Sequence, residues 1–451
     1  MTTTETKRSV GVIGILIGIL GYFFLLGLQI IMHPYTTNGL YFQKWSSEIL
    51  MQTVSLADLQ ASPFAALWNI HIQPPMFDVI RAILVQLWAA SNLFELVRHV
   101  DQLIYQLWMV LYGTLGLLIF SWLSKLMETK IAVVLTFAFL LHPATISFAT
   151  LLDSTFLSTV LITWLFYLLW KIKNGYSTST ISLSLVFLAV FFTRSIFQLP
   201  AIFLFAVSLL FFKVSKRDIF LFLLIAGGLS GLYLAKQFVQ FDLLTTSSFS
   251  GLNLTRSVGQ YPVDYWTYDL PALGKERKQQ LPTVLTRKYK ITGTPNFNAI
   301  GYLQLNRSLT EEYTQFVSVA SASMLAASYL ENFTLYFLPS SQYTENVIVK
   351  RLFWRPYYDA VFSAPVFPIL LFASGVLWLL RSIRRKDYGA IGLLLPGIYI
   401  FFVCIFFEKG ENMRFKYFLE PIYFISIAFY SSRLVQRIWC KIAPKEMPSL
   451  A

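Results

Sequence analysis

Charged residues are scarce in this sequence. Asp, Glu, Lys and Arg make up 13% of its 451 residues, whereas about 25% is usual for a soluble domain. Hydrophobic residues make up 56%, and several apolar runs reach the roughly 18 residues that are needed to cross a hydrocarbon layer. The shortage of charge excludes a water-soluble protein of this length, and the apolar runs indicate an integral membrane protein.

Cysteine is also scarce, and the basic residues do not form a nucleic-acid-binding surface. Cys404 falls inside an apolar run and Cys440 in a basic tail, so these two cysteines do not predict a disulfide framework. The net charge is +13, but Lys and Arg gather at the ends of apolar runs, where they set membrane topology. No soluble stretch interleaves basic with aromatic residues, so we expect no nucleic-acid partner.

The apolar runs predict an all-α polytopic membrane fold with about ten spans. The first run is longer than a signal-peptide core and lacks a small-residue cleavage site, so we expect a retained span. With the N-terminus in the cytoplasm, six basic connectors fall on the cytoplasmic side, in agreement with the positive-inside rule. The expected spans are residues 10–32, 104–123, 131–149, 155–170, 181–193, 196–212, 219–238, 358–380, 389–407 and 415–434.

This topology leaves two large loops on the extracytoplasmic face. The first covers about residues 33–103 and the second about residues 239–357. We therefore expect an N-terminal transmembrane module that contains the first loop, then the second loop, then a C-terminal transmembrane module with a cytoplasmic tail. These three regions are residues 1–238, 239–357 and 358–451.

Both loops are expected to carry amphipathic or interfacial helices. Residues 40–52 and 75–90 of the first loop are amphipathic helix candidates, and the second of these begins with proline, as helices often do. Residues 316–338 are apolar enough to span the membrane, but a crossing there would place Arg381 to Lys386 outside. We therefore expect an interfacial or cavity-lining helix at residues 316–338.

Asp153 is the strongest candidate for chemistry. It ends the Leu-Leu-Asp turn at residues 151–153, which joins the third and fourth expected spans. An ionisable residue at the edge of the membrane is costly unless it has a partner or a function. In the alternative interpretation its carboxylate caps the fourth span, because Asp-Ser-Thr is a good N-cap sequence.

Two polar residues of the first loop are further candidates. His71 and Gln73 precede the proline pair Pro74-Pro75, which ends any helix before it and permits one after it. Both side chains would then project from an ordered extended segment at the membrane surface. Alternatively, the segment is a rigid structural turn with polar residues at the interface.

Basic residues are rare on the outer side, which makes the few that occur there informative. Arg194 lies at the outer tip of the hairpin formed by the short fifth and sixth spans, and Lys236 lies near the outer end of the seventh. Two cations facing one cavity suit a phosphate or pyrophosphate group, although each could instead reach towards lipid headgroups. The turn before the last span adds Glu411, Arg414 and Lys416, and its two cations run against the positive-inside trend.

Taken in order, these elements resemble the GT-C superfamily of polytopic glycosyltransferases. That superfamily includes protein O-mannosyltransferases and the aminoarabinose transferases that act on lipid A. The resemblance covers most of the chain and rests on the large loop after the first span and on three motifs. The motifs are His-x-Gln-Pro-Pro at residues 71–75, Leu-Leu-Asp at 151–153 and Glu-x-x-Arg-Phe-Lys-Tyr at 411–417.

The resemblance implies a reaction and its partners. Such enzymes take a sugar from a polyprenyl-phosphate donor and transfer it to a glycan, lipid or protein acceptor on the extracytoplasmic face of the lipid bilayer. It favours a bacterial cytoplasmic membrane over the endoplasmic reticulum. The implied site comprises Asp153 as a catalytic residue and His71, Gln73, Arg194, Lys236, Glu411, Arg414 and Lys416 as substrate-binding residues.

One position departs from the family pattern. The family usually has an acidic residue just after the first span, and the matching residue here is Asn38, whose amide cannot accept a proton at neutral pH. The open alternatives are that Glu48 or Asp58 acts as the base, that the acceptor is already an anion, or that the protein is not catalytic. Asp153 could hold a divalent cation, Mg²⁺ or Mn²⁺, as in some family members, although one carboxylate alone does not make a metal site.

Two other functions compete with glycosyl transfer. One is a lipid or solute transporter, and the other is a non-catalytic protein that binds lipid-linked glycans. Charges near the bilayer centre and unwound helices would favour a transporter. The charges here lie mostly at the outer ends of the spans, so we favour the transferase.

Overall fold

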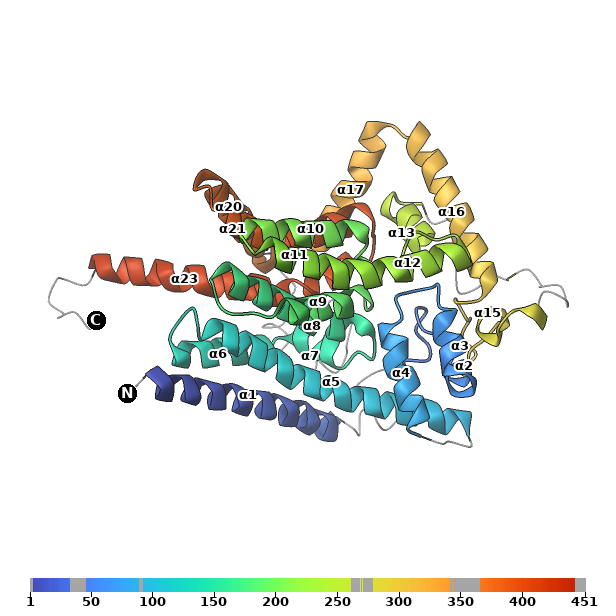
Figure 1. Ribbon diagram of the computed structural model, residues 1–451, viewed down its shortest axis with the longest axis horizontal. Helices are drawn as coiled ribbons and strands as arrows, with labels where there is room; N and C mark the ends of the chain where they lie inside the picture. Colours follow the sequence, from blue (N-terminus) through green and yellow to red (C-terminus); the bar gives the residue numbers. More distant parts are fainter. Residues whose placement is uncertain are drawn as a thin grey trace.

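The computed structural model of the chain is mostly helical within the residues that it describes. That part comprises residues 3–32, 46–88, 92–260, 268, 270, 279–340, 343 and 366–442. Within it there is no β-strand, and the only β-type pairing is an isolated bridge between Tyr289 and Pro295. Figure 1 shows long helices, among them α1 (Thr3–Met32), α5 (Leu93–Leu123) and α23 (Glu420–Ile442), lying along the long axis with both termini at one end.

Five helices of the described residues are long and apolar enough to cross a membrane. They are α1, α5, α8 (Ser154–Lys173), the continuous helix Lys216–Phe241 and α21 (Tyr388–Phe406). A sixth candidate is the pair α6 (Thr129–Leu140) and α7 (Pro143–Ala149), if these two helices, bent by 61°, form one broken span. These helices fit an all-α integral membrane protein.

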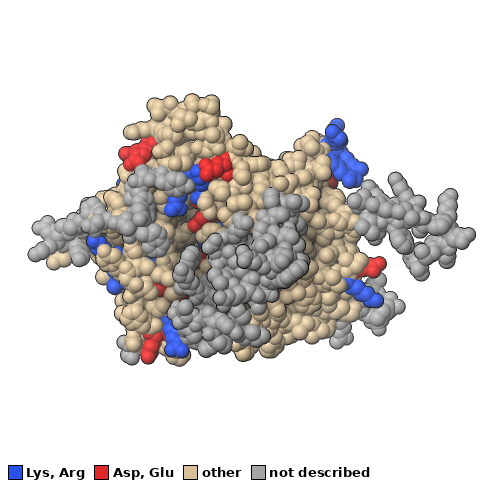
Figure 2. Space-filling model, turned by 180° about the vertical axis from the view of Figure 1, so that it is seen from behind, with Lys and Arg blue, Asp and Glu red and all other residues tan. Residues whose placement is uncertain are grey.

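Four further helices occupy the places of expected spans. α9 (Thr180–Phe191) and α10 (Leu199–Phe211) are apolar but shorter than the others. α20 (Val366–Arg384) and α23 lie where the eighth and tenth spans are expected. The count of about ten spans therefore stays a prediction. Among the described residues on the face shown in Figure 2, Lys, Arg, Asp and Glu occupy only small parts of the surface, as expected for a membrane protein.

The helix Lys216–Phe241 contains a short irregularity. It consists of α11 (Lys216–Phe222), a π-helical turn η2 (Leu223–Gly227) and α12 (Gly228–Phe241). Such a turn inserts one residue into the helix and so shifts the face on which later side chains lie. On the last part, Gln237 is buried and donates a hydrogen bond to the carbonyl of Ile70, 3.0 Å away, which attaches this span to the first loop.

Glycines let α1 and α5 pack with their backbones in contact. A Cβ atom at Gly113 would collide with the carbonyl oxygen of Gly18, and one at Gly18 would lie 3.3 Å from the carbonyl oxygen of Gly113. Small residues at such crossings are a main source of helix association in lipid, because they allow close van der Waals packing. α1 precedes the first loop and α5 contains its last residues, so this contact joins the two helices that flank the loop.

Of the two helices that the sequence predicts in the first loop, the structure contains the second. Its described helices are α2 (Leu56–Ala61), α3 (Pro63–Trp68) and α4 (Met76–Gln86). α4 confirms the amphipathic helix expected at 75–90. The helix expected at 40–52 is wrong for residues 46–52, which form turns because Glu48 faces inwards and accepts hydrogen bonds from Ser55 and Leu56.

The second loop contributes α13 (Ser250–Ser257), α15 (Thr283–Thr286), α16 (Ile300–Val319) and α17 (Ala322–Tyr336). The helix expected at 316–338 is interrupted: Ala320 and Ser321 have extended backbone, and the Ser321 side chain accepts a hydrogen bond from Met324 to start α17. The resulting hairpin of α16 and α17 projects from the bundle (Figure 1). Its base is tied to α21, because Asn332 donates to the carbonyl of Ile405.

The two outer loops pack against each other as one layer at the end of the bundle away from the termini (Figure 1). Arg287 of the second loop contacts both carboxylate oxygens of Asp58 in the first, at 3.0–3.1 Å. The Asn298 side chain accepts a hydrogen bond from the amide of His71 (2.9 Å) and donates one to the carbonyl of Asn69 (3.0 Å). These long-range contacts place both loops around the cleft that is described next.

Candidate functional site

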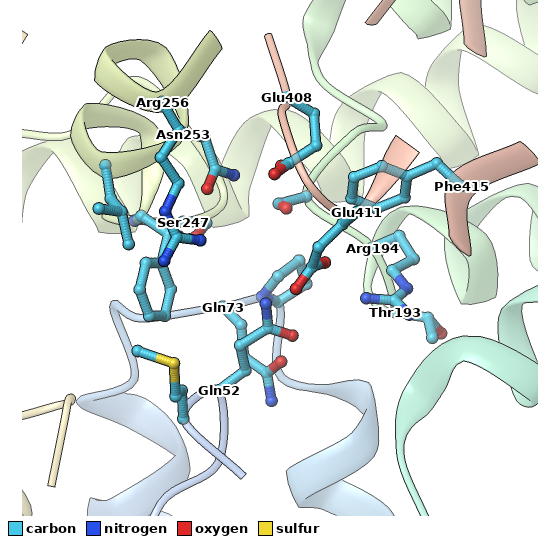
Figure 3. Close-up of a pocket in the computed structure, with 15 residues that line it drawn as sticks. Gln52, Gln73, Thr193, Arg194, Ser247, Asn253, Arg256, Glu408, Glu411 and Phe415 are labelled. Atoms are coloured by element: carbon cyan, nitrogen blue, oxygen red, sulfur yellow. Dashed lines mark hydrogen bonds between the residues drawn. The ribbon is translucent and has the colours of Figure 1, made fainter. Parts of the chain in front are cut away.

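A cleft lies where the two large loops meet the ends of the spans (Figure 3). It holds about 540 Å³ of empty space, part of it continuous with open solvent. Four segments line it: the first loop, the turn between α9 and α10, the start of the second loop with α13, and the turn that follows α21. Its polar lining includes Gln52, Gln73, Arg194, Asn253, Arg256, Glu408 and Glu411.

Asp153 begins α8 beside this cleft and has two partners. Its Oδ1 accepts a hydrogen bond from the amide of Thr155 at 2.8 Å, so it is the N-cap of α8. Its Oδ2 accepts from the Thr155 hydroxyl at 2.9 Å and from Arg414 at 2.6 Å. The capping role and a charged partner are thus both present, and Asp153 is almost fully buried.

Arg414 is the centre of a buried ionic cluster. It bonds Asp153, and its Nη1 lies 2.8 Å from Glu411 Oε2 and 3.2 Å from the hydroxyl of Tyr343. It also donates through Nε to Thr155 Oγ1 at 2.7 Å. α22 (Asn412–Tyr417) is a short helix that places Arg414 beside the start of α8. The structure therefore brings Asp153 together with Glu411 and Arg414, two predicted site residues that lie far later in the sequence.

Arg194 belongs to the same cluster. Its Nη2 donates to Thr155 Oγ1 at 2.6 Å and its Nε to Ser158 at 3.2 Å, and its guanidinium lies 5.1 Å from the centre of the Phe418 ring. None of these contacts neutralises its charge. Burial and the nearby Arg414 lower the pKa of Arg194. An anion in the cleft would therefore interact strongly with Arg194, because a buried cation without an ionic partner is costly.

Lys236 and Lys416 lie outside the cleft lining. The Lys236 ammonium is 3.4 Å from the carbonyl of Ile70 and within 5.4–5.6 Å of the ring centres of Trp68, Tyr233 and Phe241. Lys416 donates to the carbonyl of Leu338 and forms an ion pair of 3.7 Å with Glu420. The cation that lies across the cleft from Arg194 is Arg256 on α13 (Figure 3).

The His-x-Gln-Pro-Pro segment is fixed by the second loop. His71 is fully buried; its Nε2 lies 2.9 Å from the carbonyl oxygen of Asn298 and its Nδ1 2.9 Å from the Ser248 hydroxyl. A carbonyl only accepts, so Nε2 carries the proton and Nδ1 accepts from Ser248. Gln73, two residues on, lines the cleft. His71 thus orders the segment that presents Gln73.

The buried imidazole makes stability depend on pH. Burial lowers the pKa of His71 from 6.5 to about 3, although the Asn298 carbonyl opposes this. Between these pH values the unfolded state binds more protons, so stability rises with pH. At pH 4.5 the loss is about 2–3 kcal/mol relative to pH 7, at about 1.4 kcal/mol per pH unit below 6.5. Thermal melting of the purified protein from pH 4 to 8 measures it.

His71→Gln tests the origin of this pH dependence, with His99→Gln as a matched control on α5. The pH dependence should become shallower between pH 4 and 6.5 only in the His71 variant. Parallel curves for all three proteins would contradict the assignment.

Glu48, a candidate base, lies in a second ionic cluster behind the cleft. Its Oε2 is 2.7 Å from Arg81, which also reaches Asp78 at 2.6 Å, and all three side chains are fully buried. Its Oε1 accepts from Ser55 (2.9 Å) and from the amide of Ile291 (3.3 Å). Glu48 is not among the residues that line the cleft.

The remaining predictions concern two residues, Asn38 and Asp58, and a metal site at Asp153. Asn38 lies outside the described residues. Asp58, the other candidate base, is held by Arg287. Around Asp153 the described residues do not fit a divalent cation, because both carboxylate oxygens already accept hydrogen bonds and one faces Arg414. The described part of the chain contains no group of three or more His, Cys, Asp or Glu residues that could hold a metal ion.

Sequence reasoning missed Arg256 and did not single out Glu408. Arg256 is one of several cations of the second loop, and its local sequence carries no sign of a site. Glu408 follows α21, in the same charged turn as the predicted site residues Glu411, Arg414 and Lys416. Its position just after an expected span is the sequence signal that would have identified it.

No protein-family model and no curated protein matches the chain. Among solved structures, the chain is similar to the oligosaccharyltransferase of Archaeoglobus fulgidus in a complex with Zn and sulfate. The TM-score is 0.44 and the sequence identity is 12%, and the alignment covers 96% of this chain and 50% of that chain. It is also similar to oligosaccharyltransferase AglB of that organism in complex with an inhibitory peptide and a dolichol-phosphate. Here the TM-score is 0.43 and the identity 13%, and the alignment covers 98% of this chain and 52% of that chain. The chain spans about half the length of these proteins, and the similarity is too low to assign it to their family.

Proposed function

We propose that the chain is a glycosyltransferase that moves a sugar from a polyprenyl-phosphate donor to an acceptor on the extracytoplasmic face of the membrane. The observation that carries this proposal is the cleft between both outer loops and the span ends, which holds two arginines and two carboxyl groups. A lipid-linked donor requires such a place, because its chain stays among the spans while its sugar and phosphate need polar partners.

The cations of the cleft suit the phosphate of the donor. Arg194 and Arg256 line the cleft from opposite sides (Figure 3), and the described contacts of Arg194 are to hydroxyl groups and aromatic rings. Guanidinium groups bind phosphate oxygens with charge-assisted hydrogen bonds. The same groups would stabilise the negative charge that develops on the phosphate as the sugar leaves it.

The uncharged polar residues suit the sugar. Gln52 and Gln73 lie on the first-loop side of the cleft and Asn253 on the α13 side (Figure 3). Amide side chains both donate and accept, so they can bind sugar hydroxyls in either sense. Asp153 takes a positioning role in this scheme, since it holds Arg414 and Thr155, and Thr155 in turn holds Arg194. The acceptor would be a glycan, lipid or protein hydroxyl.

Binding of farnesyl phosphate to the protein in nanodiscs tests the phosphate site. Arg194→Met and Arg256→Met should each raise Kd by about tenfold or more, since a charged hydrogen bond contributes about 1.5–3 kcal/mol. Arg217→Met, an exposed cation at the start of α11, is the matched control and should leave Kd unchanged. Affinity that is insensitive to both cleft variants would contradict this phosphate site.

Turnover distinguishes the proposed enzyme from a transporter or a binding protein. Wild-type protein should release prenyl phosphate from at least one member of a set of prenyl-phosphate hexoses, pentoses and amino sugars. Movement of such a lipid across reconstituted vesicles without release of prenyl phosphate would contradict the transferase and favour a transporter. Binding without release or movement would favour a non-catalytic protein.

A further inference from the structure

The turn after α21 places a carboxyl group of unusual character in the cleft. Glu408 lines the cleft, yet only 3% of the residue is exposed. Its Oε1 has no hydrogen-bond partner among the residues that the structure describes. Leaving a buried polar atom unpaired costs about 1–3 kcal/mol. Figure 3 shows the Glu408 carboxyl group directed into the cleft, where a substrate would supply the missing partner.

Glu411 lies three residues further on and faces the same cleft. It differs from Glu408 in having a cationic partner, since its Oε2 is 2.8 Å from Arg414. The side chain is 25% exposed, and its Oε1 is 3.4 Å from the hydroxyl of Tyr343. Figure 3 shows its carboxylate directed towards the centre of the cleft, between Glu408 and the amide of Gln73. The two carboxyl groups are thus neighbours with different surroundings.

These surroundings shift the pKa values of the two carboxyl groups in opposite directions. Burial and the charge of Glu411 raise the pKa of Glu408 well above its usual value, and the nearby Arg256 and Arg414 do not compensate. Burial alone would raise the pKa of Glu411 too, but Arg414, Arg194 and Arg256 together lower it. These opposite shifts favour a proton on Glu408 and an ionised Glu411. Two carboxyl groups driven apart in this way are suited to act as acid and base in one reaction.

We propose that Glu411 is the general base and Glu408 the general acid of the transfer reaction, so that the last outer turn, and not the first loop, supplies the proton chemistry. This inference rests on the proposed function of the cleft. It supplies a base in place of Asn38, because the two candidate bases of the first loop, Glu48 and Asp58, are each paired with an arginine. Glu48 is paired with Arg81, and Asp58 with Arg287.

The reaction balances with these two groups alone. A lone pair of the acceptor oxygen forms a bond to C1 of the sugar, and the bond from C1 to the phosphate oxygen breaks, with its electron pair going to the phosphate. The acceptor hydroxyl proton passes to Glu411, and the Glu408 proton passes to the departing phosphate. The donor phosphodiester and the product phosphate monoester then both carry one negative charge. Transfer of a proton from Glu411 to Glu408 restores the starting state.

The position of the arginines agrees with this division of roles. Arg194 and Arg256 line the cleft beside the two carboxyl groups (Figure 3) and would hold the phosphate next to the acid. Arg414 keeps Glu411 ionised without occupying its Oε1, which faces the hydroxyl of Tyr343 at the outer limit of hydrogen bonding. A proton acceptor therefore remains accessible at Glu411 Oε1.

The test compares Glu408→Gln and Glu411→Gln with the wild type in nanodiscs. The readout is the initial rate of prenyl-phosphate release from the set of prenyl-phosphate sugars, with water, simple alcohols and glycosides as acceptors. Each variant should slow release by about 10²–10⁴-fold, the usual contribution of a general acid or base. Glu331→Gln, an exposed glutamate paired with Lys409 on the surface, is the matched control and should keep the wild-type rate.

The pH profile distinguishes proton transfer from a structural role. The wild-type rate should rise with pH as Glu411 loses its proton and fall as Glu408 loses its own, which gives a bell shape. Glu408→Gln should remove the alkaline limb and Glu411→Gln the acidic limb. Gln has the shape of the neutral carboxyl group of Glu408, so Glu408→Gln should fold. Its pH profile therefore tests the proposal even if Glu411→Gln does not fold.

Two failures are distinguishable. A wild-type protein that releases prenyl phosphate, together with a Glu408→Gln variant that has the full rate and an unchanged profile, overturns this inference and leaves the proposed function standing. A wild-type protein that releases no prenyl phosphate from any donor overturns the proposed function and this inference with it.

Discussion

Replacing Arg81 by methionine is expected to lower the free energy of unfolding by about 3–5 kcal/mol, the usual cost of removing one partner from a buried ion pair. Arg81 is fully buried between Glu48 and Asp78, at 2.7 and 2.6 Å. The variant leaves two carboxylates with Lys290, a buried cation that interacts electrostatically with both. Lys290 is itself tied to the carbonyl of Leu50 at 2.6 Å and to the Thr53 hydroxyl at 2.9 Å.

Chemical denaturation of the purified protein in detergent measures this loss. Arg98→Met, an exposed arginine on α5, is the control and should change stability by no more than about 0.5 kcal/mol. Adding Glu48→Gln and Asp78→Asn to Arg81→Met should recover part of the loss, because the remaining groups are then uncharged. An Arg81→Met protein that unfolds at the same denaturant concentration as the wild type would show that the cluster is solvated.

Replacing Asp153 by asparagine is expected to slow sugar transfer by about 10- to 100-fold. The variant exchanges a charged hydrogen bond to Arg414, 2.6 Å long, for an uncharged one. Such bonds contribute about 1.5–3 kcal/mol, and each 1.4 kcal/mol is a factor of ten in rate. Because Arg414 and Arg194 both donate to Thr155, the loss of charge at Asp153 also loosens the arginine that lines the cleft.

The readout for Asp153→Asn is the rate of prenyl-phosphate release together with the melting temperature. Melting should fall only modestly, because an asparagine still caps α8 through its side-chain oxygen. Asp242→Asn, an exposed aspartate at the end of α12 with left-handed backbone, is the control, since asparagine is well tolerated there. An Asp153→Asn enzyme with the wild-type rate would remove Asp153 from the site.

The membrane-spanning helices were predictable from the sequence because lipid imposes a simple rule. Apolar runs of sufficient length become helices, and the basic residues at their ends remain in water. α4 was predictable for a local reason, since Pro75 prevents helix before it and favours one after it. The short pieces α9 and α10 show the limit of this rule, because their lengths leave the number of spans open.

The members of the site were partly predictable, but their pairing was not. Asp153, Arg194, Glu411 and Arg414 drew attention because charges at span ends need a reason. The contact of Asp153 with Arg414 joins residues 261 positions apart, and no local pattern carries such a pairing. Glu48 shows the converse. Its sequence position suggested a base, whereas the structure pairs it with Arg81, on a helix 33 residues later.

The contacts between the two outer loops also set an order of events during biosynthesis. His71 meets Asn298, 227 residues later, and Glu48 meets the backbone of Ile291, 243 residues later. Seven of the expected spans must therefore be synthesised before the first loop can acquire these partners. Throughout that time the cluster of Glu48, Asp78 and Arg81 lacks its contact with the second loop. Variants that weaken this cluster should be most vulnerable to quality-control proteases while the chain is still being made.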